Sequence, residues 1–188
     1  EKVEFYFAET KSKLIDIFNE LQTIIPEVLS SYSWKKSMKW SVYDLNWGRP
    51  LKSIIAIFNK KIISFKFHHL KSNNEALIDS VDNDKKRIIK DFKSYQAVLK
   101  SEEIVLDQEK RKEIILKKMN KICDSRDLQK NFNEKLVQEV VNLVEKPNVI
   151  LCNFDETYLK IPKEILIVTM QHHQKYFPLF DSNHKLTN

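Results

Sequence analysis

The chain of 188 residues contains a single glycine, Gly48. Walker loops and dinucleotide-binding turns need several glycines at fixed spacing, because the backbone must approach the phosphates closely. One glycine therefore excludes both loop types from this chain. The short motifs H-E-x-x-H, G-x-S-x-G and D-x-D-x-D-G are absent as well. The sequence predicts no nucleotide site and no catalytic metal site of a known short-motif type.

Cysteine is also scarce: Cys123 and Cys152 are isolated and form no C-x-x-C pair, which argues against a zinc site. Two lone thiols in a lysine-rich chain are typical of a reducing compartment, so we expect a cytoplasmic protein. No apolar run of about 18 residues occurs, so no membrane partner is expected. The chain begins with Glu1 and shows no charged-then-apolar leader, which predicts a fragment without a visible signal peptide.

The chain carries a net charge of +6, from 32 basic and 26 acidic residues. An excess of positive charge is typical of proteins with an anionic partner such as nucleic acid. The basic residues are nearly all lysines, and isoleucine and asparagine are also abundant. A genome rich in A and T would produce the same composition, and composition alone leaves both interpretations open.

Strand-like and helix-like segments alternate irregularly along the chain. Apolar residues at helical spacing predict helices over 14–29 with Thr10 as cap, 91–99, 107–122, 133–144 and 162–175. Short apolar runs predict strands at 3–8, 51–58, 62–67, 88–89, 104–106, 149–154 and 176–180. Hairpins are expected around Asn59 and across 182–183. This pattern predicts an α+β fold, with a mixed or antiparallel sheet covered by helices.

Residues 71–87 form the least regular stretch, and we expect a mobile loop there, with at most a short helix at 75–78. His68 and His69 end the preceding strand. A metal site would need further ligands that the sequence does not place, so solvated histidines are expected.

All three tryptophans, Trp34, Trp40 and Trp47, fall in one stretch with interleaved lysines and Arg49. Aromatic and basic side chains in alternation can bind single-stranded nucleic acid by stacking and phosphate contacts. Tryptophans in such a loop also commonly close the edge of a hydrophobic core. Arg49 has the same two interpretations, as a phosphate contact or as a buried hydrogen-bonding anchor for the loop.

A second polar group lies at 171–176 (Q-H-H-Q-K-Y), where the helix that starts at Pro162 must end before Pro178. Two imidazoles, two amides, an ammonium and a phenol meet at this corner. Such a corner can hydrogen-bond a phosphate or a sugar, and it can equally be a structural joint.

Several short segments resemble one family. Residues 38–40 (M-K-W) and 47–50 (W-G-R-P) resemble its M-(R/K)-W … (F/W)-x-R-P pattern, and 143–147 (L-V-E-K-P) resembles L-V-E-x-P. Residues 154–162 (F-D-E-T-Y-L-K-I-P) and 169–178 (T-M-Q-H-H-Q-K-Y-F-P) are similar to two further segments. In order and spacing, these segments resemble the bacterial glycyl-tRNA synthetase beta subunit over nearly the whole chain.

The resemblance implies a ligase of α2β2 type that joins glycine to its tRNA with ATP. It implies that the alpha subunit holds the glycine and ATP site, with Mg, so that no cofactor is expected here. The chain is then expected to be an N-terminal part of beta, similar in fold to the B3/B4 editing-type module of phenylalanyl-tRNA synthetase beta. Its expected partners are the alpha subunit, glycine tRNA and the remaining domains of beta.

We therefore expect one module over residues 1–188, with a helical, Trp-rich leading segment at 1–50 and an α+β core at 51–188. Its expected role is non-catalytic, in tRNA placement or in subunit assembly. The alternatives are an editing-type deacylase module, active or vestigial, and a purely structural scaffold. If RNA contacts this chain, the predicted phosphate contacts are Lys35, Lys36, Lys39, Arg49, His172 and Lys175.

The sequence departs from the family after the hairpin, and residues 185–188 (K-L-T-N) only partly follow the family's K-L-x-P-N-F. The family carries a G-H-R-F segment after the hairpin, and residues 71–87 contain no such text. Either this loop has diverged or residues are missing from it.

Overall fold

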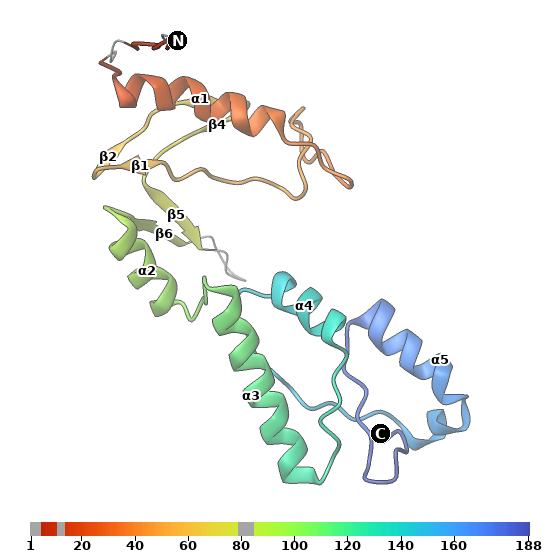
Figure 1. Cartoon of the computed structure of the whole chain (residues 1–188). Helices are drawn as coiled ribbons and strands as arrows, with labels where there is room; N and C mark the ends of the chain where they lie inside the picture. The colour runs from red at the N-terminus through yellow and green to blue at the C-terminus, as the bar shows by residue number, and fades with distance from the viewer. Residues whose placement is uncertain (1–4, 11–13, 79–84) are drawn as a thin grey trace. The chain divides into compact units, whose positions relative to one another are not determined.

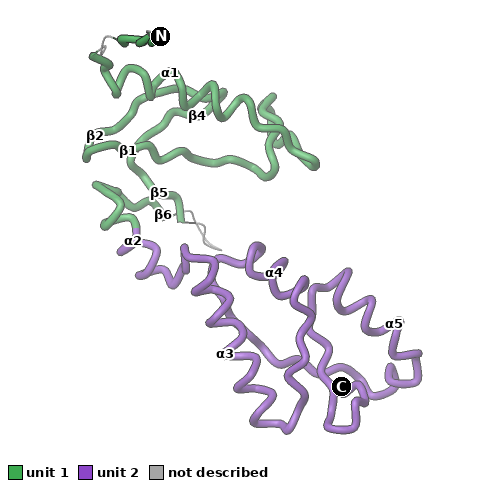
Figure 2. Tube along the Cα trace, viewed as in Figure 1, with its two compact units in different colours: residues 1–95 green, residues 96–188 purple. Residues whose placement is uncertain are grey.

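The computed structural model describes residues 5–10, 14–78 and 85–188. The chain forms two compact units, residues 1–95 and 96–188 (Figure 2). The described residues contain five α-helices and three two-stranded antiparallel sheets (Figure 1), which confirms the α+β class. The strands form these small sheets and not one mixed sheet. The division expected after residue 50 does not coincide with the boundary between the units.

The first unit opens with helix α1 (Ile17–Ser31). The Asp16 side chain caps it, accepting the backbone N–H of Phe18 at 3.1 Å. The prediction of Thr10 as the cap is wrong, because Asp16 is the capping side chain next to the first regular turn. Residues 11–13, between Thr10 and the predicted helix, lie outside the described part of the chain. Residues 5–8, expected as a strand, are exposed and irregular.

Two consecutive hairpins follow α1. Strands β1 (Ile57–Phe58) and β2 (Lys61–Ile62) turn at Asn59 and Lys60, whose φ angles are 46° and 62°, as predicted for a hairpin there. Strands β3 (Lys66–Phe67) and β4 (Leu70–Lys71) form a second hairpin that the sequence did not predict. It turns at His68, whose φ is 50°.

A third hairpin occupies the stretch predicted to be a mobile loop. Strands β5 (Glu75–Ile78) and β6 (Lys85–Ile88) pair over four residues each, so the prediction of a loop with a short helix is wrong for the described part of this stretch. Ala76 and Ile78 of β5 are buried at alternate positions, which favours a strand with one face inward. Residues 79–84 lie outside the described residues.

The core of the first unit contains Leu45, Ile63, Phe65 and Phe67, all buried. One face of α1 packs against this cluster through Phe18, Leu21, Ile25 and Leu29. Trp40 and Trp47 pack against it from the Trp-rich loop. The alternation of buried and exposed residues from 63 to 67 directs Ser64 and Lys66 away from the core.

The second unit is built from helices. Helix α2 (Phe92–Ser101) crosses the boundary, and α3 (Gln108–Arg126) and α4 (Glu134–Leu143) follow. The helices predicted to begin at Asp107 and Asn133 are confirmed, and both residues cap them, since both side chains accept N–H groups of the first turn. A 3-10 turn η1 (Glu156–Lys160), helix α5 (Lys163–Val168) and a π-helical turn η2 (Thr169–Gln174) complete it.

Arg111 of α3 is buried and determines the structure around it. Its Nε donates to the Val141 carbonyl at 3.0 Å, and its Nη1 donates to the carbonyls of Val105 at 2.6 Å and Leu106 at 2.9 Å. The prediction of a strand at 104–106 is wrong, because two of its carbonyls bond this guanidinium. The predicted central strand at 149–154 is also irregular, and Val149 packs on the α3–α4 core instead of on a sheet.

The chain ends in a hairpin across 182–183, as predicted, although it is reduced to one antiparallel bridge between Phe180 and Leu186. No helix in the described ranges is both long and apolar enough to cross a bilayer.

Candidate nucleic-acid interface

The Trp-rich loop between α1 and β1 is organised by an aromatic cluster. The ring centroids of Trp34 and Trp47 lie 4.9 Å apart, and Tyr32 lies 6.0 Å from each of them. Trp47 also meets Phe67 of the core edge-on at 5.7 Å. Trp47 therefore closes the core, whereas Trp34 keeps 42% of its surface exposed. The core-closing role is thus confirmed for Trp47, and the nucleic-acid role of the loop stays a prediction for which Trp34 offers an exposed ring.

Gly48, the only glycine of the chain, is required by this cluster. A Cβ atom at this position would lie 2.9 Å from Cε3 of Trp34, closer than real side chains approach. The absence of a side chain lets the Trp34 ring lie directly on the backbone. The Met38–Trp47 antiparallel bridge holds the two arms of the loop together below it.

Three of the four cations predicted on this loop are exposed and make no ion pair with any described residue: Lys35, Lys36 and Arg49. The interpretation of Arg49 as a buried anchor is therefore wrong. Lys39 forms an ion pair with Asp44 at 3.3 Å, with both side chains largely exposed, so the pair stabilises the loop only weakly.

Acidic residues are almost absent around this loop. From Val28 to Asn74 the chain has nine lysines and arginines and one acidic residue, Asp44. Residues 96–188, in contrast, contain 15 basic and 14 acidic residues. A bias in base composition would act on both units alike, so the local excess favours the interpretation as an anion-binding surface.

The second predicted group, at the corner after η2, lies in the other unit. Lys175 adopts a left-handed backbone, with φ of 60°, and its Nζ pairs with Glu139 of α4 at 2.7 Å. The backbone N–H groups of Lys175 and Tyr176 both bond the Met170 carbonyl. His172 is exposed. These contacts are those of a structural joint, and Lys175 is already neutralised within the fold.

The second unit also contains a cavity of about 920 Å³ between α3, α4, residues 147–154 and the η2 corner. Its walls are mainly aliphatic and aromatic. Cys123 lies on its wall, and burial raises the pKa of this thiol, so it stays protonated and unreactive near neutral pH. No group of three or more metal-ligating side chains occurs within the described ranges.

Comparison with known proteins identifies the family. The family model described as "Glycyl-tRNA synthetase beta subunit" matches residues 1–188. The chain belongs to this family. It is 38% identical over 177 residues to the glycine–tRNA ligase beta subunit of Rickettsia akari (strain Hartford), covering 94% of the chain and 27% of that protein. It is 38% identical over 183 residues to that of Rickettsia peacockii (strain Rustic), covering 97% and 28%.

The chain thus spans about a quarter of the length of these beta subunits. In this member of the glycyl-tRNA synthetase beta family, the structure brings Lys35, Lys36, Lys39 and Arg49 onto one loop and places His172 and Lys175 in another unit. Sequence reasoning missed two basic residues that the β3–β4 hairpin pairs, Lys66 and Lys71. The depletion of acidic residues from 28 to 74 was a signal that could have drawn attention to them.

Proposed function

We propose that this chain is a non-catalytic, RNA-contacting module of the beta subunit of a glycine–tRNA ligase. The whole enzyme attaches glycine to its tRNA with ATP. The alpha subunit supplies the glycine, ATP and Mg site, and this module helps to place the tRNA. Family membership over the full chain supports the subunit role.

The observation that carries the proposal is the unpaired charge of the Trp-rich loop. Lys35, Lys36 and Arg49 are exposed beside the half-exposed ring of Trp34. Ammonium and guanidinium groups bind phosphate oxygens, and an exposed indole can stack on an unpaired base. The aromatic cluster holds Trp34 in place before RNA arrives, so little ordering is needed on binding.

The corner residues contribute less to the proposed surface. The ammonium of Lys175 is engaged by Glu139, so using it for phosphate would break an ion pair of the fold. His172 is exposed, and the other predicted contact in the same unit, Lys175, is ion-paired.

Editing is the alternative activity of this module. Glycine is the smallest amino acid, so a synthetic site can exclude larger side chains sterically and has little need of proofreading. Among the described residues, no hydroxyl or thiol is hydrogen-bonded to a histidine as an activated nucleophile would be. Turnover of mischarged glycine tRNA by the beta subunit, lost in a variant of the cavity wall, would favour editing over placement.

The test is a titration of the whole beta subunit with its glycine tRNA at several salt concentrations. The triple variant Lys35→Gln, Lys36→Gln, Arg49→Gln should lose at least about tenfold in affinity, and its log K against log salt should flatten by about 2 to 3. The control removes three exposed charges from α3, at Lys110, Lys117 and Lys121, and should bind as the parent does. Equal losses in both variants would reduce the effect to net charge and contradict a localised interface.

A further inference from the structure

Two lysines face each other across the β3–β4 hairpin. Lys66 and Lys71 are direct partners in the antiparallel register, so their side chains leave the same face. Opposite residues in such a pair have Cβ atoms about 5 Å apart, and like charges at this spacing destabilise the pairing. Both side chains are exposed. An isolated fold gains nothing from this arrangement.

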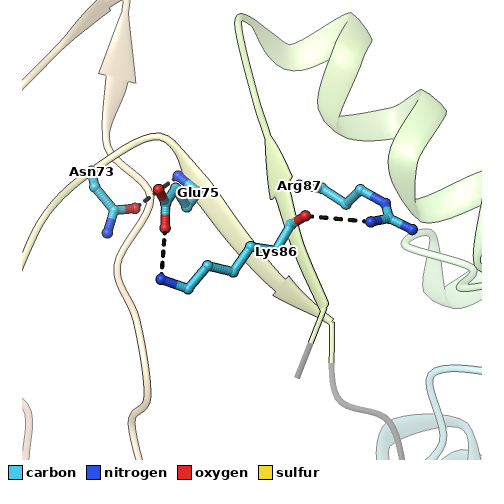
Figure 3. A network of polar contacts seen from close by, with 4 residues as sticks. All are labelled: Asn73, Glu75, Lys86 and Arg87. Atoms are coloured by element: carbon cyan, nitrogen blue, oxygen red, sulfur yellow. Dashed lines mark hydrogen bonds and ion pairs between the residues drawn. The ribbon is translucent and has the colours of Figure 1, made fainter. Parts of the chain in front are cut away.

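Neighbouring acids do not relieve the repulsion, because each is already paired. Asp44 pairs with Lys39 at 3.3 Å. Glu75, the acid closest to Lys71 in the sequence, pairs with Lys86 of β6 at 3.2 Å, and the Asn73 side chain accepts its backbone N–H at 2.8 Å (Figure 3). Within the described residues neither Lys66 nor Lys71 has an ion-pair partner.

The two lysines share a hollow of about 470 Å³ with Ser64 and His69. The Nδ1 atom of His69 is buried and has no hydrogen-bond partner in the described structure, and an unsatisfied buried polar atom destabilises the fold. The His69 ring is stacked on Tyr43 with centroids 3.6 Å apart. The expectation of a solvated histidine is therefore wrong for His69.

We propose that this hollow binds a phosphate group between the ammonium groups of Lys66 and Lys71. Together they present six N–H donors, and the Ser64 hydroxyl and the His69 ring border the same space. The Tyr43–His69 stack joins the hollow to the Trp-rich loop. The phosphate belongs either to an RNA backbone, in which case the inference rests on the proposed function, or to a free phosphate ion.

The first arm of the test uses inorganic phosphate and the whole beta subunit. Phosphate, compared with chloride at equal ionic strength, should raise the thermal midpoint of the parent. It should not raise that of the double variant Lys66→Gln, Lys71→Gln. The control Lys90→Gln, Lys100→Gln removes two exposed charges elsewhere and should respond as the parent does.

The second arm uses the salt-dependent titration with glycine tRNA. Loss of one phosphate contact in Lys66→Gln, Lys71→Gln should flatten the salt slope by about 1 relative to the control pair. A flattened slope assigns the site to an RNA phosphate, and a response to inorganic phosphate with an unchanged slope assigns it to a free ion.

If the double variant matches its control in both arms, the phosphate site is overturned. That result leaves the Trp-rich loop untouched, because its own triple variant tests it separately. Conversely, inorganic phosphate could raise the thermal midpoint of a beta subunit that does not bind glycine tRNA. That result would support the phosphate site and contradict the proposed function.

Discussion

The second unit and the stretch from Val28 to Asn74 of the first unit differ in their balance of charge. In residues 96–188 basic and acidic residues are nearly balanced, and lysines pair across elements: Lys146 with Glu103 at 2.6 Å, Lys175 with Glu139 at 2.7 Å, and Lys130 with Asp124. In residues 28–74 the cations outnumber the acids nine to one, and most lie on exposed loops and hairpins. Three lysines of the second unit are thus held by acids of the fold, whereas Lys66 and Lys71 of the first unit have no ion-pair partner among the described residues.

This difference separates cations held within the fold from exposed, unpaired cations more sharply than total charge does. Arg111 is the extreme structural case, buried and bonded to three backbone carbonyls. Lys66 and Lys71 are the opposite case, since two like charges directly opposite each other destabilise the strand pair when no ligand is bound. The following predictions change one side of the comparison at a time.

The largest effect is expected from Arg111→Met. It removes three hydrogen bonds and leaves the carbonyls of Val105, Leu106 and Val141 without their donor. We expect a loss of about 3 kcal/mol in local stability of the second unit. Hydrogen exchange of the α3 and α4 amides measures it, with Lys117→Met on the exposed face of α3 as control. Unchanged protection would show that Arg111 is dispensable.

A smaller effect is expected from Gly48→Ala in the first unit. The new methyl group meets the Trp34 ring at 2.9 Å, so the ring must move. Overpacking of this kind costs about 1 to 3 kcal/mol. Tryptophan fluorescence and the thermal midpoint report the shift, and tRNA affinity should fall if Trp34 stacks on a base. Ser37→Ala, in the same loop, serves as the control. Full tRNA affinity with a displaced ring would remove Trp34 from the interface.

Lys71→Glu should reverse the repulsion between the two hairpin lysines. A glutamate opposite Lys66 forms a favourable cross-strand pair, so we expect a gain of about 0.2 to 1 kcal/mol in the stability of the first unit. The stabilisation by inorganic phosphate should disappear in the same variant. Thermal unfolding with and without phosphate measures both effects. Retained phosphate stabilisation in the Lys71→Glu protein would rule out the lysine pair as the site.

The smallest effect concerns acid sensitivity at the start of α2. The backbone N–H of Ser94 donates to the Asp91 carboxylate at 2.8 Å and lowers its pKa below the ordinary value. A carboxyl group whose pKa is lowered by folding stabilises the fold at a pH above its unfolded-state pKa of about 3.9. This stabilisation is lost as the pH falls through the pKa of the folded state. The Asp91→Asn side chain still offers an oxygen that accepts the Ser94 N–H, but it has no carboxyl group to titrate.

The thermal midpoint should therefore fall less between pH 6 and pH 3 in Asp91→Asn than in the parent. The matched control is Asp107→Asn, which removes a capping carboxylate from α3 in the second unit. Identical acid profiles for the parent and Asp91→Asn would contradict a role for this carboxylate.

Local signals predicted much of the fold. The starts of α3 and α4 at Asp107 and Asn133 were recognised, because a capping side chain bonds N–H groups only two or three residues away. The hairpin at Asn59 followed from a residue that tolerates a positive φ. The β5–β6 hairpin was missed, since polar residues at 71–74 concealed the alternation of Ala76 and Ile78.

The candidate site was predicted only in part. The cations of the Trp-rich loop were found because they adjoin the tryptophans in the sequence. The Lys66–Lys71 pair was missed, because it depends on a strand register that places these two lysines opposite each other. The predicted strand at 104–106 is wrong for a similar reason, because the Arg111 side chain donates hydrogen bonds to two of its carbonyls and the sequence does not show this contact.

The sequence by itself determined the family, the α+β class, the starts of α3 and α4 and the absence of glycine-rich phosphate loops. These properties depend on ordered residue patterns or on contacts within one turn of the chain. Only the tertiary structure decided which cations are paired within the fold, where the two units divide, and which lysines share a hollow. Those properties depend on hairpin register and on Coulomb interactions and burial between side chains on different elements, which only the folded chain brings together.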